Sequence, residues 1–72
     1  MAIDGLISDF GGMLYALAAD ARTTSLDGDA FANGRAMGLY EAVSLLAQQA
    51  DSFGISRAAV GLAGVDVDGE LL

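Results

Sequence analysis

The chain contains no cysteine, no histidine and no lysine among its 72 residues. Without cysteine it can form neither a disulfide nor a thiolate metal site, and without histidine it lacks the commonest side-chain ligand of transition metals. The same absences remove most general bases and activated nucleophiles, which leaves carboxylates, hydroxyls and arginine for catalysis. The acidic clusters at 27–29 and 66–70 do not have the ligand spacing of an EF-hand calcium loop. We therefore expect no enzymatic activity, no cofactor and no metal site.

Positive charge is scarce throughout the chain. Ten acidic residues stand against three arginines, Arg22, Arg35 and Arg57, and the formal net charge is −7. Direct binding to nucleic acid requires clustered cations, whereas these three are scattered. A helix that lies on a membrane surface also needs basic residues on its polar face. The sequence therefore predicts that the partners are neither nucleic acid nor membrane. Its negative charge fits solubility, repulsion of nucleic acid or attraction to a basic partner.

Long apolar runs are absent as well. Acidic residues interrupt both halves of the chain, so that no run approaches the roughly 20 apolar residues of a membrane span. The segment from Met1 to Asp4 carries an acid where a secretory signal begins with basic residues. We expect a cytoplasmic chain that does not span a membrane.

Apolar residues are nevertheless abundant. They make up 54% of the chain, and the mean hydropathy is +0.51. A domain of this size buries only about 60% of the surface that its unfolded chain exposes. Small domains compensate with disulfides, metals or partner chains, and the composition disfavours the first two. Self-association is therefore expected to cover the apolar surface that remains.

Two stretches repeat apolar residues at alternating spacings of three and four. The first contains Ile3, Ile7, Phe10, Leu14, Leu17 and Ala21, and the second contains Ala32, Ala36, Leu39, Val43, Leu46, Ala50 and Phe53. This heptad spacing predicts amphipathic helices over about 3–21 and 31–53. Turn-forming residues fill 22–30, where Asp27 or Asp29 can cap the second helix. The predicted fold is all-α, an antiparallel two-helix hairpin.

The C-terminal part of the chain carries weaker signals. Gly54 is placed to end the second helix, and Ser56 can cap a short helix over 57–63. We therefore expect one helical domain over residues 1–64. The acidic segment 65–72 is expected to be a flexible tail.

Gly11 and Gly12 stand inside the first predicted helix. Each interior glycine disfavours a helix by about 0.8–1 kcal/mol relative to alanine, so that another contact is expected to offset the pair. Close approach of two helices at a dimer interface is one explanation. A kink between two shorter helices and a pair without any structural role are the others.

The predicted apolar faces are wider than a single partner helix requires. Two hairpins packed face to face as a two-fold dimer would bury them in a four-helix bundle. The residues expected at this dimer interface are Leu6, Phe10, Gly11, Met13, Leu14, Leu17, Leu39, Tyr40, Val43 and Leu46.

The sequence thus favours a small non-enzymatic adaptor or regulatory module, of a bacterial or phage type, that forms a homodimer and binds another protein. Tyr15, Arg35 and Glu41 are the candidate partner-binding residues, because exposed tyrosine and arginine often anchor interfaces. The alternative function is inhibition of a nucleic-acid-handling protein by acidic mimicry of DNA or RNA.

Overall fold

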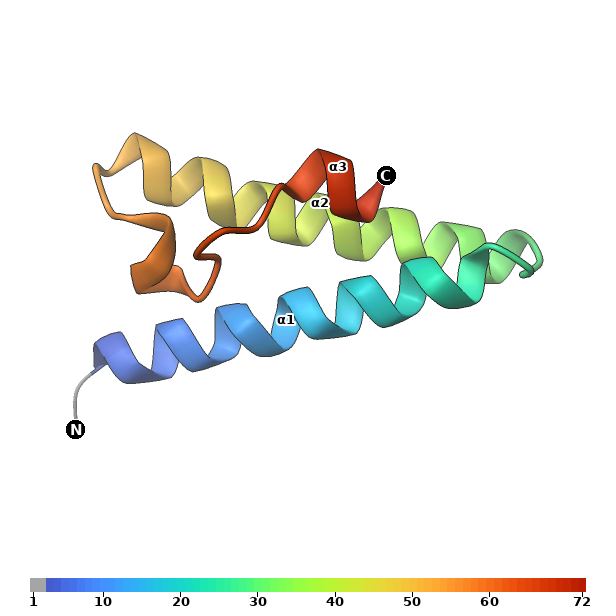
Figure 1. Cartoon of the computed structure of the whole chain (residues 1–72), viewed down its shortest axis with the longest axis horizontal. Coiled ribbons are helices and arrows are strands. Elements are labelled where there is room, and N and C mark those ends of the chain that lie inside the picture. The colour runs from blue at the N-terminus through green and yellow to red at the C-terminus, as the bar shows by residue number, and fades with distance from the viewer. Residues whose placement is uncertain (1–2) are drawn as a thin grey trace.

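A computed structural model describes residues 3–72, which form helices and connecting turns without any strand. Two long helices, α1 (Ile3–Ser25) and α2 (Ala30–Ser52), run antiparallel as a hairpin (Figure 1). A 3₁₀ turn, η1 (Arg57–Val60), and a short helix, α3 (Val67–Leu71), follow. The predicted all-α class and the hairpin are confirmed. No helix within residues 3–72 combines the length and the apolar character needed to cross a membrane.

The first helix is longer than its sequence pattern predicts. The hydroxyls of Thr23 and Thr24 donate to the carbonyl oxygens four residues earlier, at 3.1 Å each, and the Ser25 hydroxyl donates three residues back at 2.7 Å. The three hydroxyls thereby find acceptors within the helix instead of capping a turn, and the Ser25 hydroxyl supplies a donor to the Arg22 carbonyl, one of the last four carbonyls of the helix. The loop predicted over 22–30 is therefore confined to residues 26–29.

The second helix begins and ends close to its predicted bounds. Asp29 is its N-cap, and a carboxylate oxygen of Asp29 accepts a hydrogen bond from the backbone N–H of Ala32 at 3.0 Å. After the helix, Gly54 has a φ of +68°, which glycine adopts at little cost. The chain reverses direction there and returns along the hairpin (Figure 1).

The C-terminal segment differs from its prediction. The hydroxyl of Ser56 does cap the turn that follows, by accepting from the N–H of Ala59 at 3.2 Å, but the turn is a short 3₁₀ helix. The expected flexible tail at 65–72 instead contains α3, whose Val67 and Leu71 are buried. Their spacing of four residues places both on one face of a single helical turn.

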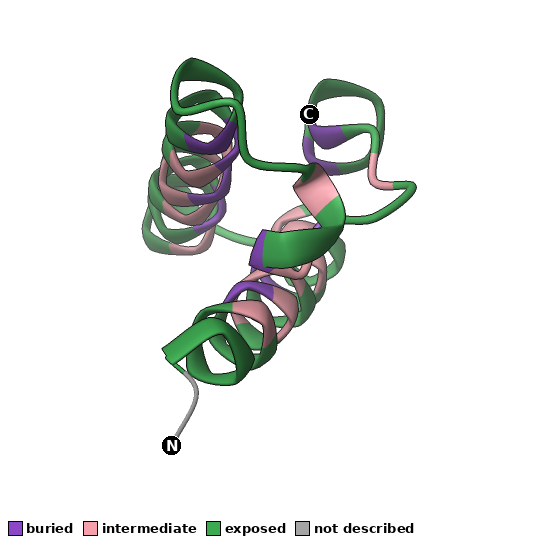
Figure 2. Ribbon diagram, turned by 90° about the vertical axis from the view of Figure 1, so that its left-hand side faces the viewer, coloured by how far each residue is buried: buried purple, intermediate pink, exposed green. Residues whose placement is uncertain are grey.

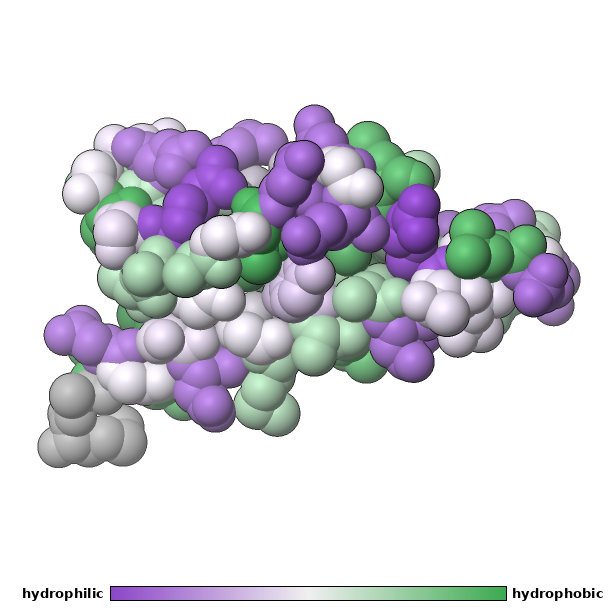
Figure 3. All heavy atoms as spheres, in the orientation of Figure 1, coloured by the Kyte–Doolittle hydropathy of each residue, from purple (hydrophilic) through white to green (hydrophobic). Residues whose placement is uncertain are grey.

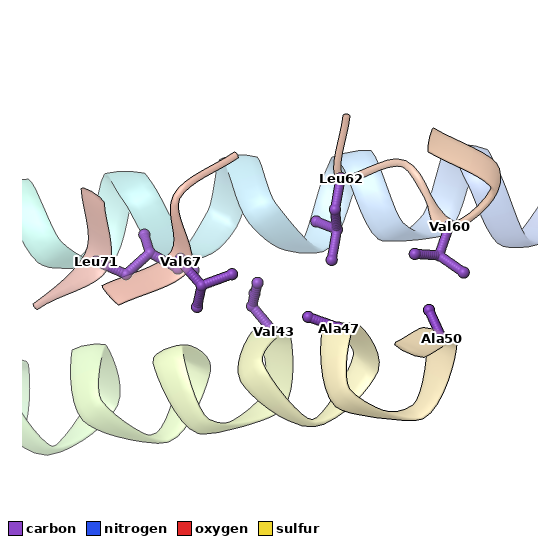
Figure 4. Packing of buried hydrophobic residues seen from close by; sticks show 8 residues of the cluster. Val43, Ala47, Ala50, Val60, Leu62, Val67 and Leu71 are labelled. Atoms are coloured by element: carbon purple, nitrogen blue, oxygen red, sulfur yellow. The ribbon is translucent and has the colours of Figure 1, made fainter. Parts of the chain in front are cut away.

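The core lies between three segments rather than two. Figure 4 shows Val43, Ala47 and Ala50 of α2 facing apolar side chains of the returning segment 57–72. Val43 and Leu62 are both 0% exposed and stand at the centre of the cluster. The buried positions lie on the inward sides of the helices, and the outward sides are exposed (Figure 2). One chain therefore closes a core of its own, and it needs the C-terminal segment to do so.

Gly11, the first residue of the glycine pair, is explained by a close crossing within the chain, whereas a Cβ atom built on Gly12 would have its nearest neighbour at 3.9 Å. Gly11 is buried, and a Cβ atom built on it would overlap the carbonyl oxygen of Val60. Gly61, with a φ of +80°, meets the same part of α1 at the Ser8 carbonyl oxygen and the Gly12 nitrogen. Since α1 is one continuous helix, the kink explanation is wrong. Backbone packs against backbone here, which only glycine allows.

Candidate interaction surface

One face of α1 is apolar and uncovered. Its large side chains are between 45% and 64% exposed and follow one another at spacings of three and four residues. They are Ile3, Leu6, Phe10, Met13 and Leu17, here called the α1 stripe. In a monomeric soluble protein, contiguous apolar surface of this kind marks an interaction site more often than single exposed residues do. The spacing is that of a coiled-coil seam.

Only some residues of the first heptad repeat face the core. Phe10 and Leu17 belong to the same heptad repeat as Leu14 and Ala21, but both are exposed, whereas Leu14 is half-buried and Ala21 is buried. The side of α1 that faces the core buries Gly11, Ala18 and Ala21 instead. At Gly11 the backbone of the returning segment approaches α1 so closely that a Cβ atom would overlap the Val60 carbonyl oxygen.

The ten residues expected at a dimer interface fall into three groups. Leu6, Phe10, Met13 and Leu17 belong to the α1 stripe; Gly11 and Val43 are buried inside the chain; and Leu14, Leu39, Tyr40 and Leu46 are half-buried. The half-buried four pack against the chain's own core. Ile3 joins the exposed group, although the expected set omits it. Its regular place in the heptad spacing was the available signal.

Both tyrosines hold α3 in place. The Tyr15 hydroxyl on α1 donates to a carboxylate oxygen of Glu70, and the Tyr40 hydroxyl on α2 donates to Asp68 at 2.7 Å. Arg22 adds a hydrogen bond from its guanidinium to the carbonyl oxygen of Leu72 at 3.2 Å. Tyr15 is therefore engaged within the chain. The other two candidate partner-binding residues, Arg35 and Glu41, are exposed on α2.

The phenol–carboxylate hydrogen bonds predict a loss of stability at alkaline pH. They raise the pKa of Tyr15 and of Tyr40 above the ordinary value of 10.0, and burial adds a smaller effect in the same direction. Because the pKa is higher in the folded chain than in the unfolded one, the contribution is complete below pH 10 and lost as pH rises through the folded pKa values.

The chain has no lysine, cysteine or histidine, so the two tyrosines are its only side chains that titrate between neutral pH and the range of arginine. The midpoint of urea unfolding should fall between pH 9 and about pH 12. In the double variant Y15F/Y40F the midpoint of urea unfolding should be lower at neutral pH. It should also be nearly independent of pH between pH 9 and about pH 12. An equal fall in both proteins would exclude this role for the tyrosines.

A second surface feature is a groove at the end of the hairpin that lies away from the loop. It has a volume of about 580 Å³ and is mostly apolar. Its walls come from the first turns of α1, the last turns of α2 and the segment 55–60. The apolar lining includes Ile7, Leu46, Phe53, Ile55 and Val60. We call it the open-end groove.

The groove could not be predicted from the sequence because it is assembled from three separate segments. The available signal was Phe53, the last residue of the second repeat, and Ile55, a large apolar residue that follows Gly54 beyond the repeat. Both are exposed in the structure.

Few polar side chains on the described surface are grouped in a way that suits ion binding or catalysis. Residues 3–72 hold no group of three acidic side chains placed to bind one metal ion. The hydrophilic residues gather mainly over α3 and the adjoining part of α2 in the view of Figure 3. Within that same range Arg57 forms the single ion pair, with Asp51, through two hydrogen bonds of 2.9 and 3.0 Å. This contact ties η1 to the end of α2 and lowers the pKa of Asp51.

Comparison with known proteins found no relative: no protein-family model, no curated protein and no solved structure matches the chain.

Proposed function

We propose that this chain is a small, non-enzymatic protein-interaction module that acts as a homodimer, with the α1 stripes of two copies packed together in a four-helix bundle. The observation that carries this proposal is the exposed heptad spacing of the α1 stripe. A second copy of α1 offers the same spacing, as a two-fold interface requires.

The size of the stripe sets the expected strength of the dimer. Burying a large apolar side chain completely stabilises a complex by about 1.5–3 kcal/mol, and half-exposed side chains contribute roughly half of that. The five side chains of each copy therefore contribute on the order of 10 kcal/mol per dimer. Association costs about 4–15 kcal/mol in lost freedom of motion. We expect a dimer that dissociates on dilution.

Charge sets the response of this dimer to salt. Asp4 and Asp9 lie on the half of α1 that bears most of the stripe, and α1 carries no base before Arg22. Pairing two copies brings like charges together, which salt screens. The dimer should therefore persist or strengthen as salt is added.

Acidic mimicry of nucleic acid makes the opposite prediction for salt, because binding to a cationic partner site weakens with ionic strength. The structure offers it less support. Asp68 and Glu70 accept hydrogen bonds from tyrosines, and Asp51 is paired with Arg57. These carboxylates are engaged within the chain rather than arrayed for a partner.

The substitution Phe10→Glu tests the homodimer. It places a charge at the middle of the α1 stripe, whose apolar contacts it would remove. Sedimentation equilibrium over about 1–100 μM should show a dimer for the wild type and a monomer for the variant across the range. Phe31→Glu is the matched control, since Phe31 is 78% exposed on α2 and lies outside the stripe. A Phe10→Glu protein that dimerises as well as the control would exclude the α1 stripe as the interface.

A further inference from the structure

The open-end groove lies beside the α1 stripe but is a different surface. Its volume of about 580 Å³ falls within the range of about 300–1,000 Å³ that is typical of ligand-binding clefts. Ile7, Phe53 and Ile55 keep large exposed fractions on its walls. The groove is therefore apolar surface that the fold of one chain does not cover.

The floor of the groove is fixed before anything binds. Val60 and Ala50 line it and are nearly completely buried in the core. The crossing of the Val60 carbonyl with Gly11 holds this floor against α1. A preformed surface loses little conformational entropy on binding, which favours affinity.

Gly5 leaves the α1 wall open. It lines the groove, and a Cβ atom built on it would meet no other atom within 4 Å. The space beside Gly5 is consequently available to a side chain from outside. It also allows the groove to be filled by substitution without disturbing the fold.

The charge around the groove is negative. Asp4 lines it, and no basic residue does. Arg57 is paired with Asp51, and Arg22 is bonded to the carbonyl oxygen of Leu72. With a net charge of −7 on the chain, an occupant gains from cations beside its apolar face.

The walls also limit the backbone form of the occupant. They consist of helices and a 3₁₀ turn, so that no sheet edge is present among the lining residues to pair with an extended strand. A peptide that lies against apolar side chains must satisfy its own backbone hydrogen bonds, and an α-helix does so.

We propose that the open-end groove binds a short amphipathic helix of another protein, whose apolar side chains enter the groove beside Gly5 and whose flanking lysine or arginine residues lie near Asp4. This inference deepens the proposed function and rests on it, because it names the chemistry of the partner that the interaction module recognises.

Fluorescence anisotropy with a labelled model peptide tests the proposal. The probe is a helix of about 18 residues, or five turns, with leucine along one face and lysine elsewhere. One comparison peptide has every lysine replaced by glutamate, and another has the lysine peptide's composition in an order without an apolar face. At about 150 mM salt, only the amphipathic lysine peptide should bind.

Three variants locate the binding. Gly5→Leu should weaken binding at least about tenfold by filling the groove. Gly34→Leu is its matched control, because a Cβ atom built on Gly34 also has no other atom within 4 Å. Asp4→Asn should weaken binding about two- to fivefold, as expected of one exposed ion pair. Circular dichroism of each variant confirms that it folds.

Several outcomes would overturn the proposal. They are no binding by the amphipathic lysine peptide, equal binding by the peptide without an apolar face, and equal binding by Gly5→Leu and Gly34→Leu. If Phe10→Glu abolished peptide binding and Gly5→Leu left it intact, the peptide would bind to the α1 stripe instead. Sedimentation of the same variants measures dimerisation separately, so that failure of the groove and failure of the homodimer are distinguishable.

Discussion

Replacing Gly11 with alanine should strongly destabilise the fold, whereas the same change at its neighbour Gly12 should stabilise it. A Cβ atom on Gly11 would overlap the backbone carbonyl of Val60, which cannot move without displacing buried residues of the core. Overpacking of this kind costs about 1–3 kcal/mol or more. At Gly12 the nearest atom is 3.9 Å away, so that alanine should contribute its better helix propensity of about 0.8–1 kcal/mol.

Thermal unfolding followed by circular dichroism measures both effects. For a domain of this size, 1 kcal/mol corresponds to a change of about 4–8 °C in the melting temperature. The two variants differ by one position in one helix and by no charge, so that each is the control for the other. Equal melting temperatures would show that the crossing of α1 with residues 60 and 61 is not made.

Replacing Leu62 with alanine should leave little folded protein. Leu62 is 0% exposed and comes from the returning segment rather than from either long helix. Large-to-small substitutions at such sites cost about 2–5 kcal/mol. A single core of this size supplies about 3–5 kcal/mol in total, so that the loss approaches the whole stability of the chain.

Leu45→Ala is the matched control for this substitution. Leu45 is 58% exposed on α2, and exposed substitutions usually change stability by about 0.5 kcal/mol or less. Urea unfolding of the two variants separates a core position from a surface one. If Leu62→Ala were as stable as Leu45→Ala, the C-terminal segment would not be part of the core.

The hairpin was predictable because its signals are local. Apolar spacings of three and four residues indicate two helices, and Asp29 before the second one is a cap that the structure uses. The end of the first helix was not predictable in the same way. Thr23 and Thr24 favour turns in most contexts, but here their hydroxyls donate to helical carbonyls four residues earlier, those of Ala19 and Asp20.

The C-terminal segment depends on contacts that are distant in sequence. Val67 and Leu71 are two apolar residues in an acidic stretch, and nothing local shows that Val43 and Leu62 lie beneath them. The glycine pair carried the strongest signal of a close crossing. Its partner was assigned to a second chain because the sequence does not show that residues 60 and 61 return to α1.

Of the two candidate surfaces, the α1 stripe was predictable in part because its spacing is local to one helix, whereas the open-end groove was not. Leu6, Phe10, Met13 and Leu17 emerge from the periodicity of one helix, although the periodicity alone does not show that they face outward. The open-end groove has walls from three segments. Its position is fixed by the tertiary fold and by no repeat within the chain.

One chain closes its core with its C-terminal segment, and we propose that it leaves the α1 stripe for a second copy. Amide chemical shifts recorded by NMR during dilution from about 1 mM to 10 μM test this most directly, because they locate the interface residue by residue. We expect the amide resonances around Leu6, Phe10, Met13 and Leu17 to shift on dilution, while those of Leu62 and α3 should not. Spectra that do not change on dilution, or changes centred on the outer face of α2, would contradict it.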